Sequence, residues 1–292
     1  RECQADRGAG EKGFCGMDER IYLARAALHM WEEPCISGTK GSGAVFFSGC
    51  GLRCCFCQNH DIAIGSRGRA VSVERLGEIF LELKEKGAAN INLVTGAHYV
   101  PQIIEALDMA RRNGLDIPVV YNSSGYEKTE TLKLLEGYVD IYLPDLKYLD
   151  PELAQKFSNA PDYVQAAKAA IGEMVRQTGK CEFGEDGYIR KGTIVRHLIL
   201  PGHTGNSIKA LRYLHETYGE DIYISIMNQY TPVRKFVEFK ELNRKVTKRE
   251  YEKVLDAAVD MGIQNGFIQE GETASESFIP DFDYEGVEKN TP

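Results

Sequence analysis

Residues 43–57 read GAVFFSGCGLRCCFC, and we expect this stretch to decide both the fold and the chemistry. Its first half is a short apolar run that ends in Ser48 and Gly49, which predicts a buried strand that leads into a loop. In α/β barrels the carboxyl ends of the strands carry the chemistry. We therefore expect the loop in the second half to lie at the functional end of the sheet.

Three of the cysteines in this loop, Cys50, Cys54 and Cys57, have the spacing C-x3-C-x2-C. Three thiolates on one tight loop can hold three corners of a cubane 4Fe–4S cluster, because soft sulfur suits iron. The fourth iron then has no cysteine nearby and stays open to another ligand. Two alternatives remain, a set of reduced thiols and a zinc knuckle that uses His60 as its fourth ligand. Cys55 fits no ligand position beside the other three, and we interpret it as a packing thiol.

The chain has 8 cysteines, and the other four are spread along it as Cys3, Cys15, Cys35 and Cys181. The first twenty residues are rich in charges and contain no apolar stretch, so they do not form a secretion signal, and a disulfide framework is disfavoured. The chain does not begin with Met, so we expect residues to be missing upstream. A second metal site at Cys3 and Cys15 would then be incomplete, and we interpret both as free thiols. Cys35 and Cys181 are expected to be structural.

The cysteine loop resembles that of the radical SAM superfamily, in its spacing, in the aromatic Phe56 before the last cysteine and in its place after a first strand. It is similar to the pyruvate formate-lyase-activating-enzyme branch, and within it to the sub-branch of activating-enzyme-related Fe–S proteins. The stretch WEEPCISG at 31–38 belongs to this resemblance, which covers roughly residues 3 to 285. The resemblance implies an open (βα)6 partial TIM barrel, a 4Fe–4S cluster, S-adenosylmethionine and an external one-electron reductant of the flavodoxin or ferredoxin type.

The order of patterns after the loop agrees with that α/β fold. Apolar runs that predict strands alternate with helical periodicity, and six strands in this order imply a parallel sheet with right-handed crossovers. The strands are expected within 43–49, 90–96, 117–121, 139–143, 194–200 and 222–227. Asp186 and Gly187 predict the tip of a small hairpin. We expect an N-terminal extension at 1–40, the radical SAM partial barrel at 41–264 and a C-terminal extension at 265–292, where 267–269 has the pattern of a last short strand.

The predicted strand ends supply candidate residues for S-adenosylmethionine. After the second strand stand Thr95, Gly96 and His98, where the family usually has Gly-Gly-Glu, and this chain lacks the Glu. Backbone carbonyls, with Thr95 or His98, would then contact the amino group of the cofactor; an ordinary turn is the alternative. After the third strand, Asn122 and Ser123 match the ribose-binding position, with an Asx turn as the alternative.

The later strands add four more candidates, and the cysteine loop adds Phe56. Asp145 and Lys147 match a D-x-K element of the branch, for the methionyl carboxylate and the ribose, with a surface ion pair as the alternative. Arg196 lies within an apolar strand, where a guanidinium must be paired, and the resemblance places it in the barrel as a clamp for a carboxylate. At the end of the sixth strand the resemblance implies a polar residue near the adenosine, which here is Asn228 or Tyr230. Phe56 is expected to pack on adenine, or to be a plain core aromatic.

Composition narrows the function class. The chain has 292 residues, of which 43% are hydrophobic and 27% charged, and its formal net charge of -8 disfavours nucleic acid as a partner. No apolar run approaches the ~20 residues of a membrane span. We expect a cytoplasmic radical SAM oxidoreductase that forms a 5′-deoxyadenosyl radical for hydrogen abstraction, with activation of a glycyl radical enzyme as one use. The alternatives are a radical SAM enzyme for another peptide or a small metabolite, and a non-catalytic Fe–S or zinc module.

Overall fold

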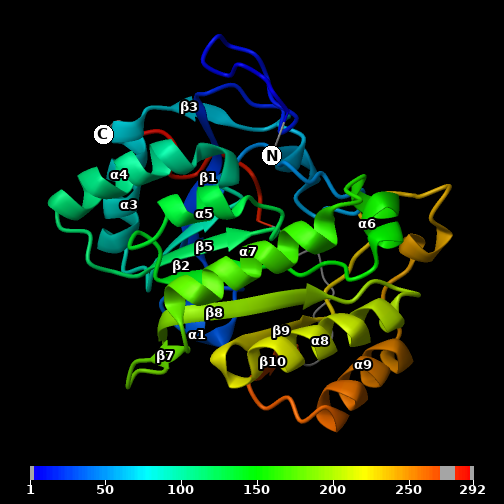
Figure 1. Ribbon diagram of the computed structural model, residues 1–292. Coiled ribbons are helices and arrows are strands. Elements are labelled where there is room, and N and C mark those ends of the chain that lie inside the picture. Colours follow the sequence, from blue (N-terminus) through cyan, green and yellow to red (C-terminus); the bar gives the residue numbers. More distant parts are fainter. Residues whose placement is uncertain (1–2, 270–279, 290–292) are drawn as a thin grey trace.

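The computed structural model describes residues 3–269 and 280–289, and its centre is one open, mostly parallel sheet (Figure 1). The strand order is β10-β9-β8-β6-β5-β4-β2-β1-β3. The parallel strands are β2 (Ser42–Phe47), β4 (Ile91–Val94), β5 (Val119–Ser123), β6 (Ile141–Pro144), β8 (Ile189–Leu198), β9 (Tyr223–Met227) and β10 (Gly266–Ile268). All six predicted strands are therefore confirmed. The two ends of the sheet do not meet, so the prediction of an open α/β barrel is also confirmed.

Strands also form in both predicted extensions. β1 (Ile21–His29) pairs antiparallel with β2, and β3 (Arg69–Val71) pairs with β1. β10 pairs with β9 beyond residue 264. The sheet thus continues across both expected boundaries, and the division into a barrel and two extensions stays a prediction. The predicted hairpin at 186–187 is confirmed, because β7 (Glu182–Phe183) pairs with the start of β8.

Most of the helices follow the strands along the chain and cover the outer face of the sheet (Figure 1). Their bounds are α2 (His60–Ala63), α3 (Val73–Glu85), α4 (Val100–Arg112), α5 (Thr129–Leu134), α6 (Pro151–Ser158), α7 (Tyr163–Thr178), α8 (Thr204–Tyr218) and α9 (Lys248–Asp260). Strand alternation separates two apolar layers. Tyr121 and Tyr142 belong to the layer under α3, α4 and α5, whereas Val120 and Ile141 point to the opposite, inner face.

The inner face is partly filled by the short helix α1 (Pro34–Ser37), which comes from the segment between β1 and β2. Its Cys35 and Ile36 pack on Val120 and Ile141. The segment just before α1 is thereby brought to the inside of the sheet.

A second segment closes on the edge of the sheet. We call residues 280–289 the C-terminal segment, which lies beside β1 in red (Figure 1). The backbone N–H of Ala26 donates to the Glu285 carbonyl, and that of Tyr284 donates to the Ala24 carbonyl. Arg25 forms ion pairs with Asp283 and Glu285.

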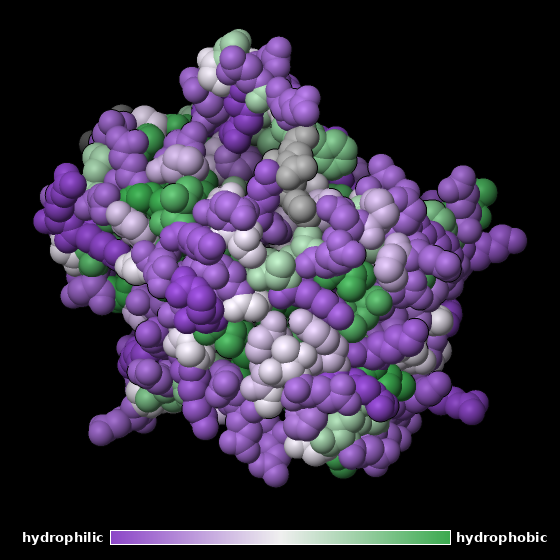
Figure 2. Space-filling view, viewed as in Figure 1, coloured by the Kyte–Doolittle hydropathy of each residue, from purple (hydrophilic) through white to green (hydrophobic). Residues whose placement is uncertain are grey.

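The surface agrees with the composition. Figure 2 shows a mainly hydrophilic face on which hydrophobic residues form small separate areas. Within the described residues, none of the helices has the length and apolarity that a membrane span requires.

Candidate active site

The cysteine loop follows β2 directly and is held by backbone contacts. Gly49 has φ +91°, and a Cβ there would come within 2.5 Å of the Met17 side chain, so the loop can start only at a glycine. The N–H of Cys55 donates to the Phe157 carbonyl at 2.8 Å, which ties the loop to α6. Arg53 also has a positive φ, +54°. The chain thus leaves the strand and turns back sharply.

The thiols of Cys50, Cys54 and Cys57 are free and line one cavity of about 210 Å³ at the ends of the parallel strands. Cys55 is also free but is not among the residues that line this cavity; it packs against the apolar layer below the loop. His60, the fourth ligand in the zinc alternative, lines a separate hollow with Arg67 and Asp283.

The donor set of three thiols on one loop suits a 4Fe–4S cluster, because soft sulfur suits iron. Among the residues that the structure describes, no three His, Cys, Asp or Glu side chains are arranged to hold one metal ion. Burial raises the pKa of Cys57 to about 12 and also raises that of Cys54, because their thiolates would lose hydration. The positive charge of several irons offsets such a cost.

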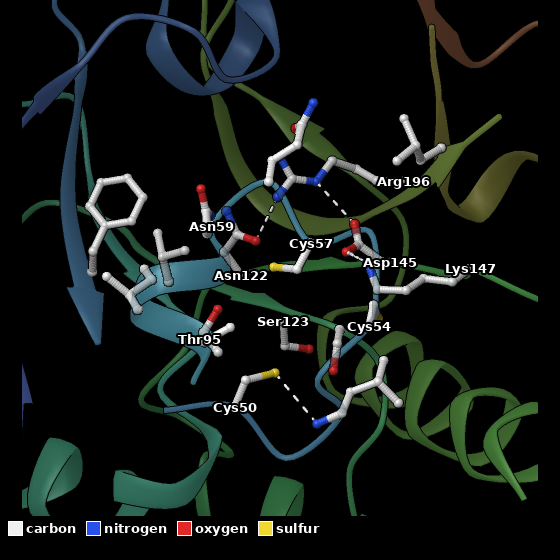
Figure 3. Close-up of a pocket in the computed structure, with 18 of the residues that line it drawn as sticks. Cys50, Cys54, Cys57, Asn59, Thr95, Asn122, Ser123, Asp145, Lys147 and Arg196 are labelled. Atoms are coloured by element: carbon white, nitrogen blue, oxygen red, sulfur yellow. Dashed lines mark hydrogen bonds and ion pairs between the residues drawn. The ribbon is translucent and has the colours of Figure 1, made fainter. Parts of the chain in front are cut away.

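Charged side chains from two other strands face the thiols across the cavity. Lys147 Nζ lies 2.5 Å from Asp145 Oδ2, and Arg196 Nε lies 3.6 Å from Asp145 Oδ1. Figure 3 shows Arg196 between Asp145 and Asn122, with its Nη2 donating to Asn122 Oδ1 at 2.5 Å. Burial alone would lower the pKa of Lys147, but the adjacent Asp145 carboxylate raises it. Both cations therefore keep their charge inside the cavity.

Glu32 is a cavity residue that sequence reasoning missed. It stands just before α1, and its side chain is 7% exposed. Its Oε1 accepts from Asn92 Nδ2 at 2.9 Å and from Asn122 Nδ2 at 3.3 Å, and its Oε2 accepts from Arg196 Nη1 at 2.7 Å. The only available signal was the stretch at 31–38, which by itself says nothing of three partners on three strands.

Seven of the predicted cofactor residues line the same cavity, namely Phe56, Thr95, Asn122, Ser123, Asp145, Lys147 and Arg196. Two of them also have close contacts within the protein. Phe56 packs edge-on against Tyr148, Phe157 and Tyr230, with centroids 6.2–6.5 Å apart, as in the core-aromatic alternative. The guanidinium of Arg196 is paired with the Glu32 carboxylate and donates to Asn122, and its role as a clamp for the cofactor carboxylate stays a prediction.

Three other predicted residues are not brought to the cavity. His98 turns away, because its Nε2 lies 2.8 Å from the Ser48 carbonyl, and burial lowers its pKa to about 4. Gly96 lies under α4, where a Cβ would come within 2.7 Å of Ile103. The backbone of Asn228 donates to Gln269, and the neighbouring Gln229 lines the cavity instead.

Comparison with known proteins identifies the family. Residues 44–214 match the family model described as the radical SAM superfamily. The chain belongs to the radical SAM superfamily. Members of this superfamily are enzymes, and their cofactors are a 4Fe–4S cluster and S-adenosylmethionine, as predicted for this chain. The three cysteines and the candidate residues from Thr95 to Arg196 lie within the matched region.

Two relatives by sequence place the chain more closely. It is 28% identical over 255 residues to an uncharacterized protein of Methanocaldococcus jannaschii, covering 85% of this chain and 70% of that protein. It is 27% identical over 113 residues to the pyruvate formate-lyase-activating enzyme of Clostridium pasteurianum, covering 37% of this chain and 46% of that enzyme. The predicted likeness to the activating-enzyme branch is therefore confirmed.

Solved structures support the fold. Streptococcus suis SuiB bound to S-adenosylmethionine has a TM-score of 0.51 at 15% identity, covering 78% of this chain and 52% of that chain. The FeFe-hydrogenase maturase HydG from Carboxydothermus hydrogenoformans has a TM-score of 0.51 at 14% identity, covering 81% of this chain and 55% of that chain. The chain thus spans about half the length of these two structures, which share its partial barrel.

Proposed function

We propose that this radical SAM enzyme cleaves S-adenosylmethionine reductively and abstracts a hydrogen atom from a peptide or protein substrate, such as the Cα of a glycine in a partner enzyme. The observation that carries the proposal is the single cavity lined by the three free thiols and by Asp145, Lys147 and Arg196. The relative that is a pyruvate formate-lyase-activating enzyme favours a glycyl radical partner. An external flavodoxin or ferredoxin would supply the electron.

Different residues of the cavity would hold different parts of the two cofactors. Cys50, Cys54 and Cys57 would hold three irons of the cluster, which supplies one electron to the sulfonium when both cofactors are bound. Lys147 is held by Asp145 and offers its ammonium group to the methionyl carboxylate. Asn122 and Ser123 offer amide and hydroxyl groups to the ribose.

The proposal is tested with protein purified and reconstituted without oxygen, reduced with dithionite and assayed for 5′-deoxyadenosine. Cys54→Ala is expected to lose both bound iron and product. Cys55→Ala is the matched control, since Cys55 is the next residue and does not line the cavity; it is expected to keep both. Absence of 5′-deoxyadenosine while iron and sulfide are intact would refute the proposal, and zinc without sulfide would support the non-catalytic module.

The substrate class needs a second measurement. A candidate glycyl radical enzyme, incubated with the reduced protein and S-adenosylmethionine, is expected to show a glycyl radical by electron paramagnetic resonance. Product without such a signal would favour another peptide or a small metabolite as the substrate.

A further inference from the structure

Three side chains of the cavity form a closed ring of hydrogen bonds. Glu32 Oε2 accepts from Arg196 Nη1 at 2.7 Å, and Arg196 Nη2 donates to Asn122 Oδ1 at 2.5 Å (Figure 3). Asn122 Nδ2 donates in turn to Glu32 Oε1 at 3.3 Å. All three residues line the cavity. They come from the segment before α1, from β5 and from β8, so the ring joins three separate parts of the fold.

The ring fixes the direction of each polar group in it. A guanidinium only donates hydrogen bonds, and a carboxylate only accepts them. Asn122 must therefore turn its amide nitrogen to Glu32 and its amide oxygen to Arg196. The third nitrogen of Arg196, Nε, lies 3.6 Å from Asp145 Oδ1. Each nitrogen of the guanidinium thus faces a partner, which sets the plane of this group in the cavity.

Glu32 is also held from outside the cavity. Its Oε1 accepts from Asn92 Nδ2 at 2.9 Å, and Asn92 is fully buried on β4 and is not among the residues that line the cavity. The Glu32 side chain is 7% exposed, so its contact with Arg196 is a buried, charge-assisted hydrogen bond. Glu32 therefore connects a central strand of the sheet to two polar groups on the cavity wall.

We propose that Glu32 is a positioning residue for S-adenosylmethionine, which acts through Arg196 and Asn122 and sets the affinity of the cavity for this cofactor. Asn122 is the residue assigned to the ribose, and Arg196 is the predicted clamp for the carboxylate. The inference rests on the proposed function only in that the cavity binds S-adenosylmethionine. Groups that are already held in place lose less conformational freedom on binding, so a fixed pair binds the cofactor more tightly than a mobile pair.

The test is the affinity of the cluster-containing protein for S-adenosylmethionine, measured without oxygen by equilibrium dialysis. Glu32→Gln keeps the shape of the side chain but replaces one acceptor oxygen by an NH2 group. Both oxygens of Glu32 meet donors, so either orientation of the glutamine sets NH2 against N–H. We expect binding to be about ten-fold weaker. In the 5′-deoxyadenosine assay, KM for the cofactor is expected to rise by the same factor while kcat stays within about two-fold.

A double variant shows whether Glu32 acts through Arg196. Arg196→Gln alone is expected to weaken binding of the cofactor. Adding Glu32→Gln to it is expected to weaken binding by less than about two-fold more, because the guanidinium that Glu32 holds is then absent. Independent effects would multiply instead, and that result would overturn the positioning role.

Glu33→Gln is the matched control. Glu33 is the next residue and is also buried, but it does not line the cavity, and its Oε2 lies 4.0 Å from Arg196 Nη1, beyond hydrogen-bond distance. This variant is expected to keep the native affinity within about two-fold. A folding defect would lower the number of binding sites that dialysis counts and leave the affinity of the remaining sites unchanged.

A second variant keeps the inference testable if Glu32→Gln does not fold. Asn92→Ala removes the support of Glu32 from outside the cavity, and it is expected to weaken binding of the cofactor about three-fold. Native affinity in whichever of these two variants folds, or no binding of S-adenosylmethionine to the native protein, would overturn the inference.

The outcome is separate from that of the 5′-deoxyadenosine assay. Weaker binding in Glu32→Gln, with no product from the native protein, would refute the proposed function and leave the positioning role in place. Product from the native protein, with native affinity in Glu32→Gln, would do the reverse.

Discussion

Thr95 is a β-branched residue with φ +62°, at the end of β4 and on the wall of the cavity. This left-handed conformation costs a β-branched residue about 1–2 kcal/mol. The N–H of Thr95 donates to the Asn122 carbonyl at 2.9 Å, which holds the strained turn in place. The strain thus lies where the chain leaves the strand and meets the expected cofactor.

Replacement of Thr95 by glycine relieves this strain. Thr95→Gly is expected to be more stable than Thr95→Ala by about 1 kcal/mol, because both variants lose the side chain but only glycine accepts the positive φ without strain. The measurement is thermal unfolding of the cluster-containing proteins. Equal melting temperatures for the two variants would contradict the strain at this position.

At the residue scale, spacing along the chain could be used, but side-chain direction could not. The spacing of Cys50, Cys54 and Cys57 made it predictable that they lie together on one loop at the cavity, and their role as cluster ligands stays a prediction. His98 was misplaced because the short 3-10 turn Ala97–Tyr99 rotates its ring toward Ser48. Glu32 could not be found, because its role depends on partners 60, 90 and 164 residues away.

At the scale of elements, the contact between the C-terminal segment and β1 depends on one glycine. Gly286 has φ +69°, and a Cβ there would overlap the carbonyl oxygen of Ala26. Gly286→Ala is therefore expected to displace the C-terminal segment from β1. Limited proteolysis measures this as faster cleavage within 280–289.

The hairpin offers the matched control for that variant. Gly187 also has a positive φ, +77°, but a Cβ there would meet nothing within 4 Å. Gly187→Ala carries only the conformational cost of about 1 kcal/mol and is expected to leave cleavage of the C-terminal segment unchanged. Equal cleavage rates in both variants would argue against the close contact at Ala26.

The elements of the parallel sheet were predictable because their apolar runs are short, β-rich and followed by turn residues. β1 was not, because Arg25 interrupts its apolar pattern. Its antiparallel pairing with β2 also departs from the alternation of parallel strands and helices that the other strands follow. Arg25 is paired by Asp283 and Glu285, and both carboxylates are distant from it in the sequence. Long-range partners of this kind leave no local pattern.

For the whole molecule, a buried histidine predicts how stability depends on pH. His197 is fully buried, its Nδ1 lies 2.6 Å from the Leu146 carbonyl, and burial lowers its pKa to about 4. In the unfolded chain a histidine has a pKa near ~6.5, so the unfolded state takes up the proton first. The contribution of His197 to the free energy of unfolding is therefore fully present above pH 6.5 and is lost as the pH falls toward 4. It amounts to about 3 kcal/mol.

The variant His197→Gln is expected to flatten that dependence. The melting temperature is measured from pH 7 to pH 4, and the fall is expected to be smaller in the variant than in the native protein. His215→Gln, on the outer helix α8, is the control and is expected to keep the native slope. A fall of native size in His197→Gln would mean that other groups set the acid limit.

The contact between the C-terminal segment and β1 also has a consequence for synthesis on the ribosome. β1 is translated before every other strand of the sheet, while Asp283 and Glu285, which pair with its Arg25, follow more than 250 residues later. Until Asp283 and Glu285 emerge from the ribosome, the part of β1 that contacts the C-terminal segment has no partner there, unless a chaperone binds it. Contacts of such sequence separation slow folding, and nascent chains that stall before residue 280 are expected to be trapped with one side of the barrel exposed.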